Sequence, residues 1–267
     1  MCRWAAYLGE PIFMSDIVTT PDYSLIKQAQ SAREGVTETN ADGFGLAWYD
    51  QRPEPGIYKD VHPAWADANL LSVTDQVSSG LFMAHVRAST GTATSRDNCH
   101  PFVSGKMSFM HNGQVGGFDA VRKSADMLIP EDIFARRRGS TDSESLFLVA
   151  VGMGLEQDPK TALERAVGQF EAMSREKGSA PHIRMTAAIS DGEKLYTVRY
   201  ASDDKAPSLY YRKSVVGQGW TVVSEPYADC GDWKQIDSGS FFTFSPEGAI
   251  PDSFEPCENK GHIWTLP

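Results

Sequence analysis

The chain begins Met1-Cys2-Arg3-Trp4-Ala5-Ala6-Tyr7, an apolar stretch with a cysteine at its second position. If Met1 is removed, Cys2 becomes the N-terminus and carries a thiol and a free α-amine on adjacent carbons. An α-amine has a pKa of about 7.7–8.0, so near neutral pH part of it can accept the thiol proton. N-terminal nucleophiles use their own amine as the base, so a catalytic Cys2 needs no separate histidine. The alternative is an inert cysteine buried at the start of a strand.

The composition is that of an ordinary globular protein. The chain has 267 residues, of which 41% are hydrophobic and 22% charged, so it is long enough to bury a substantial core. A net charge of −10 argues against nucleic acid or an anionic membrane surface as the main partner. The four cysteines form no CxxC pair and have no metal-like spacing with histidine, and no apolar signal stretch precedes them. These features predict a soluble, cytoplasmic protein without a membrane span.

Hydrophobic periodicity and turn residues predict strands first, long helices next and further strands last. We expect strands at 2–8 (closed by Gly9-Glu10-Pro11), 44–49, 80–87, 106–111, 184–190, 195–200, 208–212, 220–224 and 240–244. We expect helices at 24–32, 64–77, 118–127 and 159–177, and another starting near 140–144. The roughly 20 last residues are rich in Pro, Glu and Gly and are predicted to be a surface tail. This order indicates a single α+β domain of layered sheets and helices.

Several polar residues stand where apolar strands or helices begin or end. Arg87 follows an apolar strand, where a charge is often part of a site, although a surface arginine is the alternative. Asp142 lies at a helix start beside the capping pair Thr141 and Glu144, so it could serve as a cap alone. The turn around Asn40, Asp42, Gly43 and Gly45 is expected to support the Cys2 strand, and a substrate contact from this loop is the alternative. His85, His100 and His111 have apolar neighbours and no HxxxH pairing, which favours hydrogen-bonded strand-end histidines over metal ligands.

Together these motifs resemble a known family. Met1-Cys2, residues 40–45, His85-Val86-Arg87, residues 98–102, His111-Asn112-Gly113 and residues 140–144 occur in the order of the class II glutamine amidotransferases. The sequence is most similar to the short stand-alone γ-glutamyl hydrolases of that family. The motifs cover about residues 2 to 155, and the later strands are consistent with the family without being diagnostic of it.

The resemblance implies a four-layer αββα N-terminal-nucleophile sandwich, formed as one amidotransferase domain by residues 2–267. Cys2 resembles the nucleophile, Asn112 and Gly113 the oxyanion hole, and Arg87 and Asp142 the clamp on the amino-acid end of the substrate. A planar guanidinium suits a carboxylate because it can donate two parallel hydrogen bonds. No cofactor and no metal is implied.

These roles predict hydrolysis of the γ-glutamyl amide of glutamine or a γ-glutamyl compound through a Cys2 thioester, releasing ammonia or an amine and glutamate. After Arg87 the chain reads Ala88-Ser89-Thr90-Gly91, where many synthase-linked members carry tryptophan and later histidine. No acceptor domain follows before Pro267. Two alternatives stay open: an ammonia-supplying subunit that works with a synthase partner, and a non-catalytic protein that binds glutamine or a γ-glutamyl compound.

Overall fold

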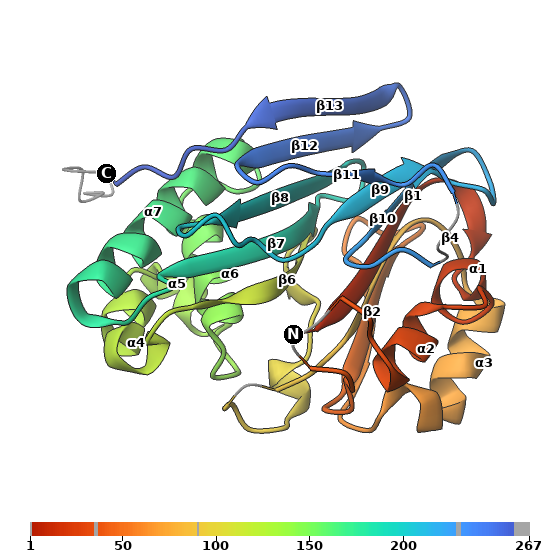
Figure 1. The fold of residues 1–267 in the computed structure, drawn as a ribbon, viewed down its shortest axis with the longest axis horizontal. Helices are drawn as coiled ribbons and strands as arrows, with labels where there is room; N and C mark the ends of the chain where they lie inside the picture. Colours follow the sequence, from red (N-terminus) through yellow and green to blue (C-terminus); the bar gives the residue numbers. More distant parts are fainter. Residues whose placement is uncertain (1, 35–36, 90, 228–230, 259–267) are drawn as a thin grey trace.

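The computed structural model describes residues 2–34, 37–89, 91–227 and 231–258, and Figure 1 shows their arrangement. Two antiparallel sheets pack face to face, and helices cover the outer face of each (Figure 1). The first sheet has the order β11 (Lys234–Gln235), β9 (Tyr210–Lys213), β10 (Gly219–Val223), β1 (Arg3–Phe13), β4 (Ser78–Val86), β2 (Phe44–Tyr49) and β3 (Gly56–Asp60). The second has the order β13 (Gly248–Ser253), β12 (Ser240–Ser245), β8 (Leu195–Ala201), β7 (Ile183–Ser190), β6 (Met107–Val115) and β5 (Phe102–Ser104).

The helices form the two outer layers (Figure 1). On the first sheet lie α1 (Ser15–Val18), α2 (Leu25–Gln30) and α3 (Ala68–Gln76), with the short 3₁₀ turn η1 (Ala64–Ala66). On the second lie α4 (Phe118–Asp126), α5 (Glu131–Phe134), α6 (Asp142–Gly152) and α7 (Pro159–Lys177). A second 3₁₀ turn, η2 (Arg96–Asn98), precedes β5. The predicted four-layer αββα sandwich in a single domain is confirmed.

Each of the three contacts between neighbouring layers has its own hydrophobic core. Strand β1 contributes side chains to two of these cores, one on each of its faces. Trp4 and Ala6 belong to the core between the sheets, whereas Ala5 and Tyr7 belong to the core under α1–α3. Side chains alternate between the faces of a strand, so a strand buried on both faces needs a continuous apolar run. This explains the apolar N-terminal stretch.

Three predicted boundaries are wrong, each for a local reason. Strand β1 does not close at residues 9–11 but continues to Phe13, because a register shift between Leu8 and Ile12 absorbs the Gly-Glu-Pro segment. Strand β6 does not stop at His111 but runs to Val115, and it pairs with β7 from Ser108 to Val115. The expected helix at 64–77 is divided at Asp67, whose carboxylate caps α3 by accepting from the Leu70 N–H at 2.7 Å.

The predicted C-terminal tail is also wrong in part. Residues 248–253 form β13, which pairs with β12 along its whole length. Residues 259–267 lie outside the described part of the chain, and so does Met1, whose removal would expose the Cys2 amine. The edge strands β3, β5 and β11 are absent from the sequence-based prediction, whereas α7 has the predicted bounds. Among the described residues, no helix has the length and apolar character needed to cross a membrane.

Candidate active site

Cys2 lies immediately before β1, and the register of the first sheet fixes its neighbours. Arg3 pairs with Val86 at the end of β4, which brings Cys2 beside Ala88. The Ala88 N–H donates to Cys2 Sγ at 3.4 Å, and the thiol lies 3.6 Å from the Ala88 carbonyl oxygen. Arg3 Nη1 donates to the Cys2 carbonyl oxygen at 2.8 Å. The backbone on both sides of the thiol is therefore held by hydrogen bonds or strand pairing.

Burial is the largest influence on the thiol and raises the pKa of Cys2. The Ala88 N–H and the positive charges of Arg87 and Arg3 act in the opposite direction but are smaller effects. A thiol with a raised pKa is mostly protonated near neutral pH, and only the thiolate is strongly nucleophilic. Chemistry at this sulfur therefore requires a base that removes its proton.

Asn112 and Gly113 lie within β6 rather than in a loop after it. Met110 belongs to the core between the sheets, so Asn112, two residues on, faces the same way, toward the first sheet. The Asn112 side chain is buried, and neither its oxygen nor its nitrogen has a hydrogen-bond partner. A buried amide without partners costs about 1–3 kcal/mol, so this group is well placed for a partner that enters the cavity.

Gly113 is required by the close approach of β6 and β7. A Cβ at this position would lie 1.8 Å from the Arg184 carbonyl oxygen, which is main chain and cannot swing away. Glycine therefore allows the backbone of residue 113 to line the cavity beside the Asn112 amide.

Arg87 follows β4, and its side chain is buried at 3% exposure. Its Nη2 donates to Thr92 Oγ1 at 2.6 Å and Ser89 Oγ at 3.2 Å, and its Nη1 donates to the Asp42 carbonyl oxygen at 3.2 Å. The Asp42 carboxylate in turn accepts from the Ser89 N–H at 2.7 Å. Arg87 is thus a buried cation held by hydroxyls and a carbonyl, with no acidic partner among the described residues. The surface-arginine alternative is wrong.

Asp142 is the first residue of α6, and it is not the cap. Thr141 is the cap, since its hydroxyl accepts from the Glu144 N–H at 3.2 Å. The Asp142 carboxylate accepts from the Val115 N–H at 2.8 Å and from the Ser143 N–H at 2.7 Å. It therefore joins the start of α6 to the end of β6, and the cap-only reading is excluded.

One cavity of about 600 Å³ brings all five predicted residues together. Cys2, Arg87, Asn112, Gly113 and Asp142 line it. Its wall continues through residues 116–120, at the start of α4, to Arg184 on β7. Arg184 is paired with Asp203 at 2.6 Å. The cavity therefore extends well beyond the residues that the sequence singled out.

The buried histidines differ from the prediction. The rings of His85 and His100 are tilted by 30° with their centroids 4.3 Å apart, and neither nitrogen of His100 has a hydrogen-bond partner among the described residues. His111 is partly satisfied, since its Nδ1 lies 2.8 Å from Ser143 Oγ. The expectation of hydrogen-bonded histidines is wrong for His100, whose ring packs against the rings of His85 and Phe102 instead. Burial lowers the pKa of His85 to about 3 and lowers that of His100 and His111, so all three are neutral at pH 7.

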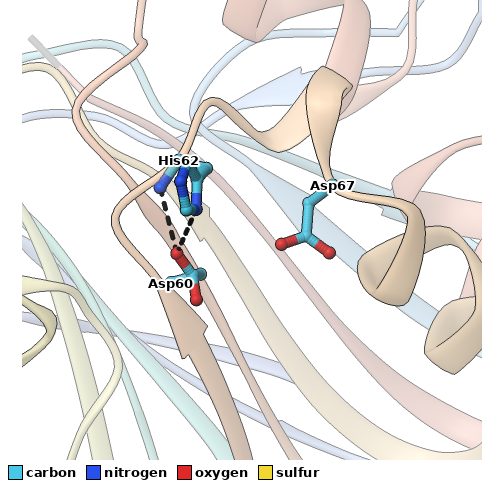
Figure 2. A group of neighbouring side chains, drawn as sticks. All are labelled: Asp60, His62 and Asp67. Atoms are coloured by element: carbon cyan, nitrogen blue, oxygen red, sulfur yellow. Dashed lines mark hydrogen bonds and ion pairs between the residues drawn. The ribbon is translucent and has the colours of Figure 1, made fainter.

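Figure 2 shows a separate cluster of Asp60, His62 and Asp67, whose side chains could in principle surround a cation. Both of its carboxylates already accept hydrogen bonds from protein groups. Asp60 accepts from His62 at 2.7 Å and from Arg96 at 2.6 Å, and Asp67 accepts from Tyr58 at 3.0 Å and caps α3. These contacts explain the cluster as a structural junction at the end of β3.

The sequence did not reveal the residues that support the site. Ser89 and Thr92 hold Arg87, and Ser143 links His111 to the segment that carries Asp142. For Ser89 the available signal is the segment Ala88-Ser89-Thr90-Gly91, which places a hydroxyl two residues after Arg87. Thr92 lies just beyond that segment and gives no signal of its own. For Ser143 the sequence shows only that it lies at the start of a helix, which does not predict its contact with His111.

A protein-family model described as "Glutamine amidotransferases class-II" matches residues 13–212. The chain is 29% identical to "Probable glutamine amidotransferase DUG3" of Saccharomyces cerevisiae, covering 92% of this chain and 82% of that protein. It is 27% identical to "Gamma-glutamyl-hercynylcysteine sulfoxide hydrolase" of Mycolicibacterium smegmatis, covering 88% of this chain and 92% of that protein.

Solved structures show the same architecture. A glutamine aminotransferase class-II domain protein from Silicibacter pomeroyi superposes with a TM-score of 0.79 at 47% identity, over 96% of this chain and all of that chain (100%). The glutamine phosphoribosylpyrophosphate amidotransferase of Bacillus subtilis superposes with a TM-score of 0.64 at 14% identity, over 97% of this chain and 50% of that chain. The second likeness concerns the fold alone.

Proposed function

Because this chain belongs to the class II glutamine amidotransferases, we propose that it hydrolyses the γ-glutamyl amide of glutamine or a γ-glutamyl compound through a thioester on Cys2. One observation carries the proposal: the Cys2 thiol and the unpartnered amide of Asn112 line the same cavity. A nucleophile and a free hydrogen-bond donor in one cavity are what acyl transfer requires. We further propose that residues 2–267 act as one catalytic domain.

In the proposed reaction the α-amine of Cys2, freed by removal of Met1, takes the thiol proton. The thiolate forms a bond to the γ-carbonyl carbon, and the carbonyl oxygen becomes negative. The Asn112 side-chain N–H and the Gly113 backbone N–H would donate to that oxygen. The C–N bond then breaks as the Cys2 ammonium returns the proton to the departing nitrogen. Water hydrolyses the thioester, which releases glutamate and restores the thiol.

Arg87 and Asp142 are proposed to bind the α-carboxylate and α-ammonium of the glutamyl group. The support is that both line the cavity with Cys2 and that Arg87 has no acidic partner among the described residues. Ser89 and Thr92 already contact its guanidinium, so a substrate carboxylate would join or replace hydroxyls, which are weaker acceptors than a carboxylate.

The size of the cavity favours a γ-glutamyl compound over a reaction confined to glutamine. A volume of about 600 Å³ lies within the usual range for ligands larger than a single amino acid. The name of the Mycolicibacterium relative describes the hydrolysis of such a compound. This is the reason for ranking hydrolysis above ammonia supply to a synthase partner.

The test is intact mass after exposure to a diazoketone analogue of glutamine, which alkylates a nucleophile held opposite a glutamyl-shaped pocket. We expect one adduct on protein that lacks Met1 and none on Cys2→Ala. Turnover of γ-glutamyl amides without any added protein would then establish hydrolysis. An adduct without turnover, relieved by a synthase, would favour the ammonia-supplying subunit. Binding of glutamine by processed protein with neither adduct nor turnover would favour the non-catalytic reading.

A further inference from the structure

A second cavity lies beside the active site, at the edges of both sheets. It has a volume of about 170 Å³ and lies between β3, β5, the segment 136–138 and α6. Three cationic side chains line it, those of Lys59, Arg136 and Arg138. Its apolar wall includes Ile57, which is 44% exposed, together with the half-buried Val103 and the edge of the buried Phe102. The lining therefore combines cationic and apolar side chains, which makes this an amphipathic cavity.

The positive charges in this cavity are not neutralised by the protein. Lys59 Nζ lies 5.1 Å from the centre of the Phe102 ring, and no hydrogen bond or ion pair to it is found among the described residues. The Arg138 guanidinium likewise has no ion pair within the described part of the chain. Lys59 is therefore a half-buried ammonium whose charge faces a cavity.

The two acidic residues that line the cavity leave these charges unpaired. Glu144 is occupied: its carboxylate accepts from Arg137 Nη1 at 2.5 Å and from the backbone N–H groups of Arg138 and Gly139. Asp97 is exposed and forms no ion pair with Lys59. The cavity thus keeps an excess of positive charge that an incoming anion could neutralise.

We propose that this second cavity binds a small organic carboxylate, with the carboxylate at the cationic side chains and an apolar body against Ile57, Phe102 and Val103. A carboxylate matches the guanidinium and ammonium donors. The apolar wall distinguishes such a ligand from an inorganic anion, since phosphate would leave that wall without a partner. Nothing in this proposal depends on the reaction at Cys2.

The second cavity is distinct from the active site, although they share a wall. The Phe102 ring packs edge-on against His100 with their centroids 4.5 Å apart, and His100 lines the active-site cavity. A ligand on the Phe102 side therefore lies behind the wall of the active site rather than inside it.

The binding should depend on pH through Lys59. Burial lowers the pKa of Lys59 to about 8, so its ammonium is lost just above neutral pH. The titratable and charged groups that face it are Asp97, Glu144, Cys99, His85, His100, Arg136 and Arg138. Burial raises the pKa of Cys99 and lowers the pKa values of the two histidines, so these groups are neutral near pH 8, and the arginines keep their charge. Carboxylate affinity should therefore fall as pH rises through about 8.

Titration calorimetry with isovalerate tests the proposal, with isoamyl alcohol as its uncharged counterpart. We expect isovalerate to bind and the alcohol not to bind. Lys59→Met removes the charge while keeping the aliphatic stem, and should weaken isovalerate binding roughly tenfold or more, as expected for a lost charge-assisted hydrogen bond. The matched control is Lys234→Met, the same change on β11 at the opposite edge of the same sheet, which should bind as the unaltered protein does.

Three outcomes would overturn the site: no binding of isovalerate, equal binding of the alcohol, or binding that Lys59→Met leaves unchanged. The last would place the carboxylate elsewhere, for example at Arg87. If Lys59→Met does not fold, Arg138→Gln replaces it, because Arg138 is exposed and its side chain supports no described contact. Undiminished isovalerate binding by folded Arg138→Gln would then count against the site, and weakened binding would support it.

Discussion

The proposed role of Asn112 as an oxyanion donor can be tested directly by substitution. Its amide is buried and has no partner in the protein, so replacing it removes no described hydrogen bond. If it donates to the oxyanion, Asn112→Ala should lower kcat about 10²–10³-fold with a much smaller change in KM, since the interaction forms in the transition state. Steady-state kinetics on a γ-glutamyl amide measure both constants.

The control for Asn112→Ala is its unfolding free energy, which should fall little because no described side-chain hydrogen bond is lost and an unpartnered buried amide is removed. A folded variant with kcat within a few-fold of the unaltered protein would remove Asn112 from the reaction. A parallel loss of kcat and stability would instead indicate that the amide is structural.

Substitution of Glu225 tests how much a buried ion pair contributes to the free energy of unfolding. Its carboxylate lies 2.8 Å from Arg3 Nε with both side chains buried, and it also accepts from Tyr23 and the Arg33 N–H. Glu225→Gln leaves Arg3 as an unpaired buried cation, which should cost about 3–5 kcal/mol. Urea denaturation measures the loss.

The control for this ion pair is an exposed one. Lys160 and Asp252 lie 2.7 Å apart on the surface, where solvent screens the charges. Asp252→Asn should therefore leave the denaturation midpoint almost unchanged. Equal effects of Glu225→Gln and Asp252→Asn would mean that burial of the Arg3 pair has no energetic consequence.

Among the elements, the pairing of β6 with β7 sets the geometry of the site. Gly113→Ala would place a methyl group 1.8 Å from the Arg184 carbonyl oxygen, so the two strands must separate. We expect a loss of most activity together with a lower melting temperature. Gly248→Ala on β13 is the matched control, because no atom lies within 4 Å of the position that its methyl group would occupy. An active, stable Gly113→Ala would contradict this account of the strand pair.

The elements also show what sequence patterns can predict. Helix α7 has its predicted bounds because a long amphipathic repeat and a proline at its start are local signals. The predicted end of β6 is wrong because His-Asn-Gly has the composition of a turn, whereas the pairing with β7 that keeps it extended comes from residues about 75 positions later in the chain. Short edge strands such as β3 are not predicted because they have little apolar alternation of their own.

The site is predictable to the extent that its residues follow apolar strands or start a helix. Arg87 and Asp142 are found in this way, and both line the cavity with Cys2. Their roles in binding substrate stay predictions. Their supporting contacts are not predictable, because they join distant segments, as where the Ser89 N–H donates to Asp42, 47 residues away.

At the scale of the whole molecule, the buried histidines couple folding to pH. His100 and His111 line the active-site cavity, His85 packs against His100, and each is almost fully buried. The pKa of His85 falls from an ordinary 6.5 to about 3, and the pKa values of His100 and His111 are also lowered. The unfolded chain therefore binds protons between these values that the folded chain does not bind.

The sign of the effect follows from this difference in bound protons. When the unfolded state binds more protons, the free energy of unfolding falls as pH is lowered, by up to about 1.4 kcal/mol per pH unit for each histidine. The loss should begin near pH 6.5 and grow down to pH 5. Carboxylates such as Asp60, whose pKa is lowered by its hydrogen bond to Arg96, lose their contribution only at lower pH. The histidines should therefore dominate in this window.

Urea denaturation between about pH 7 and pH 5 measures the slope. His85→Phe keeps an aromatic ring against His100 but cannot take up a proton, so it should lessen the slope even if it changes the stability at pH 7. Proton NMR of the imidazole resonances gives an independent check, since His85 should stay neutral at pH 5 in the folded protein. A flat stability profile, or a His85 resonance that titrates near pH 6.5, would mean that water reaches the rings of His85 and His100 and that the wall between the two cavities is open.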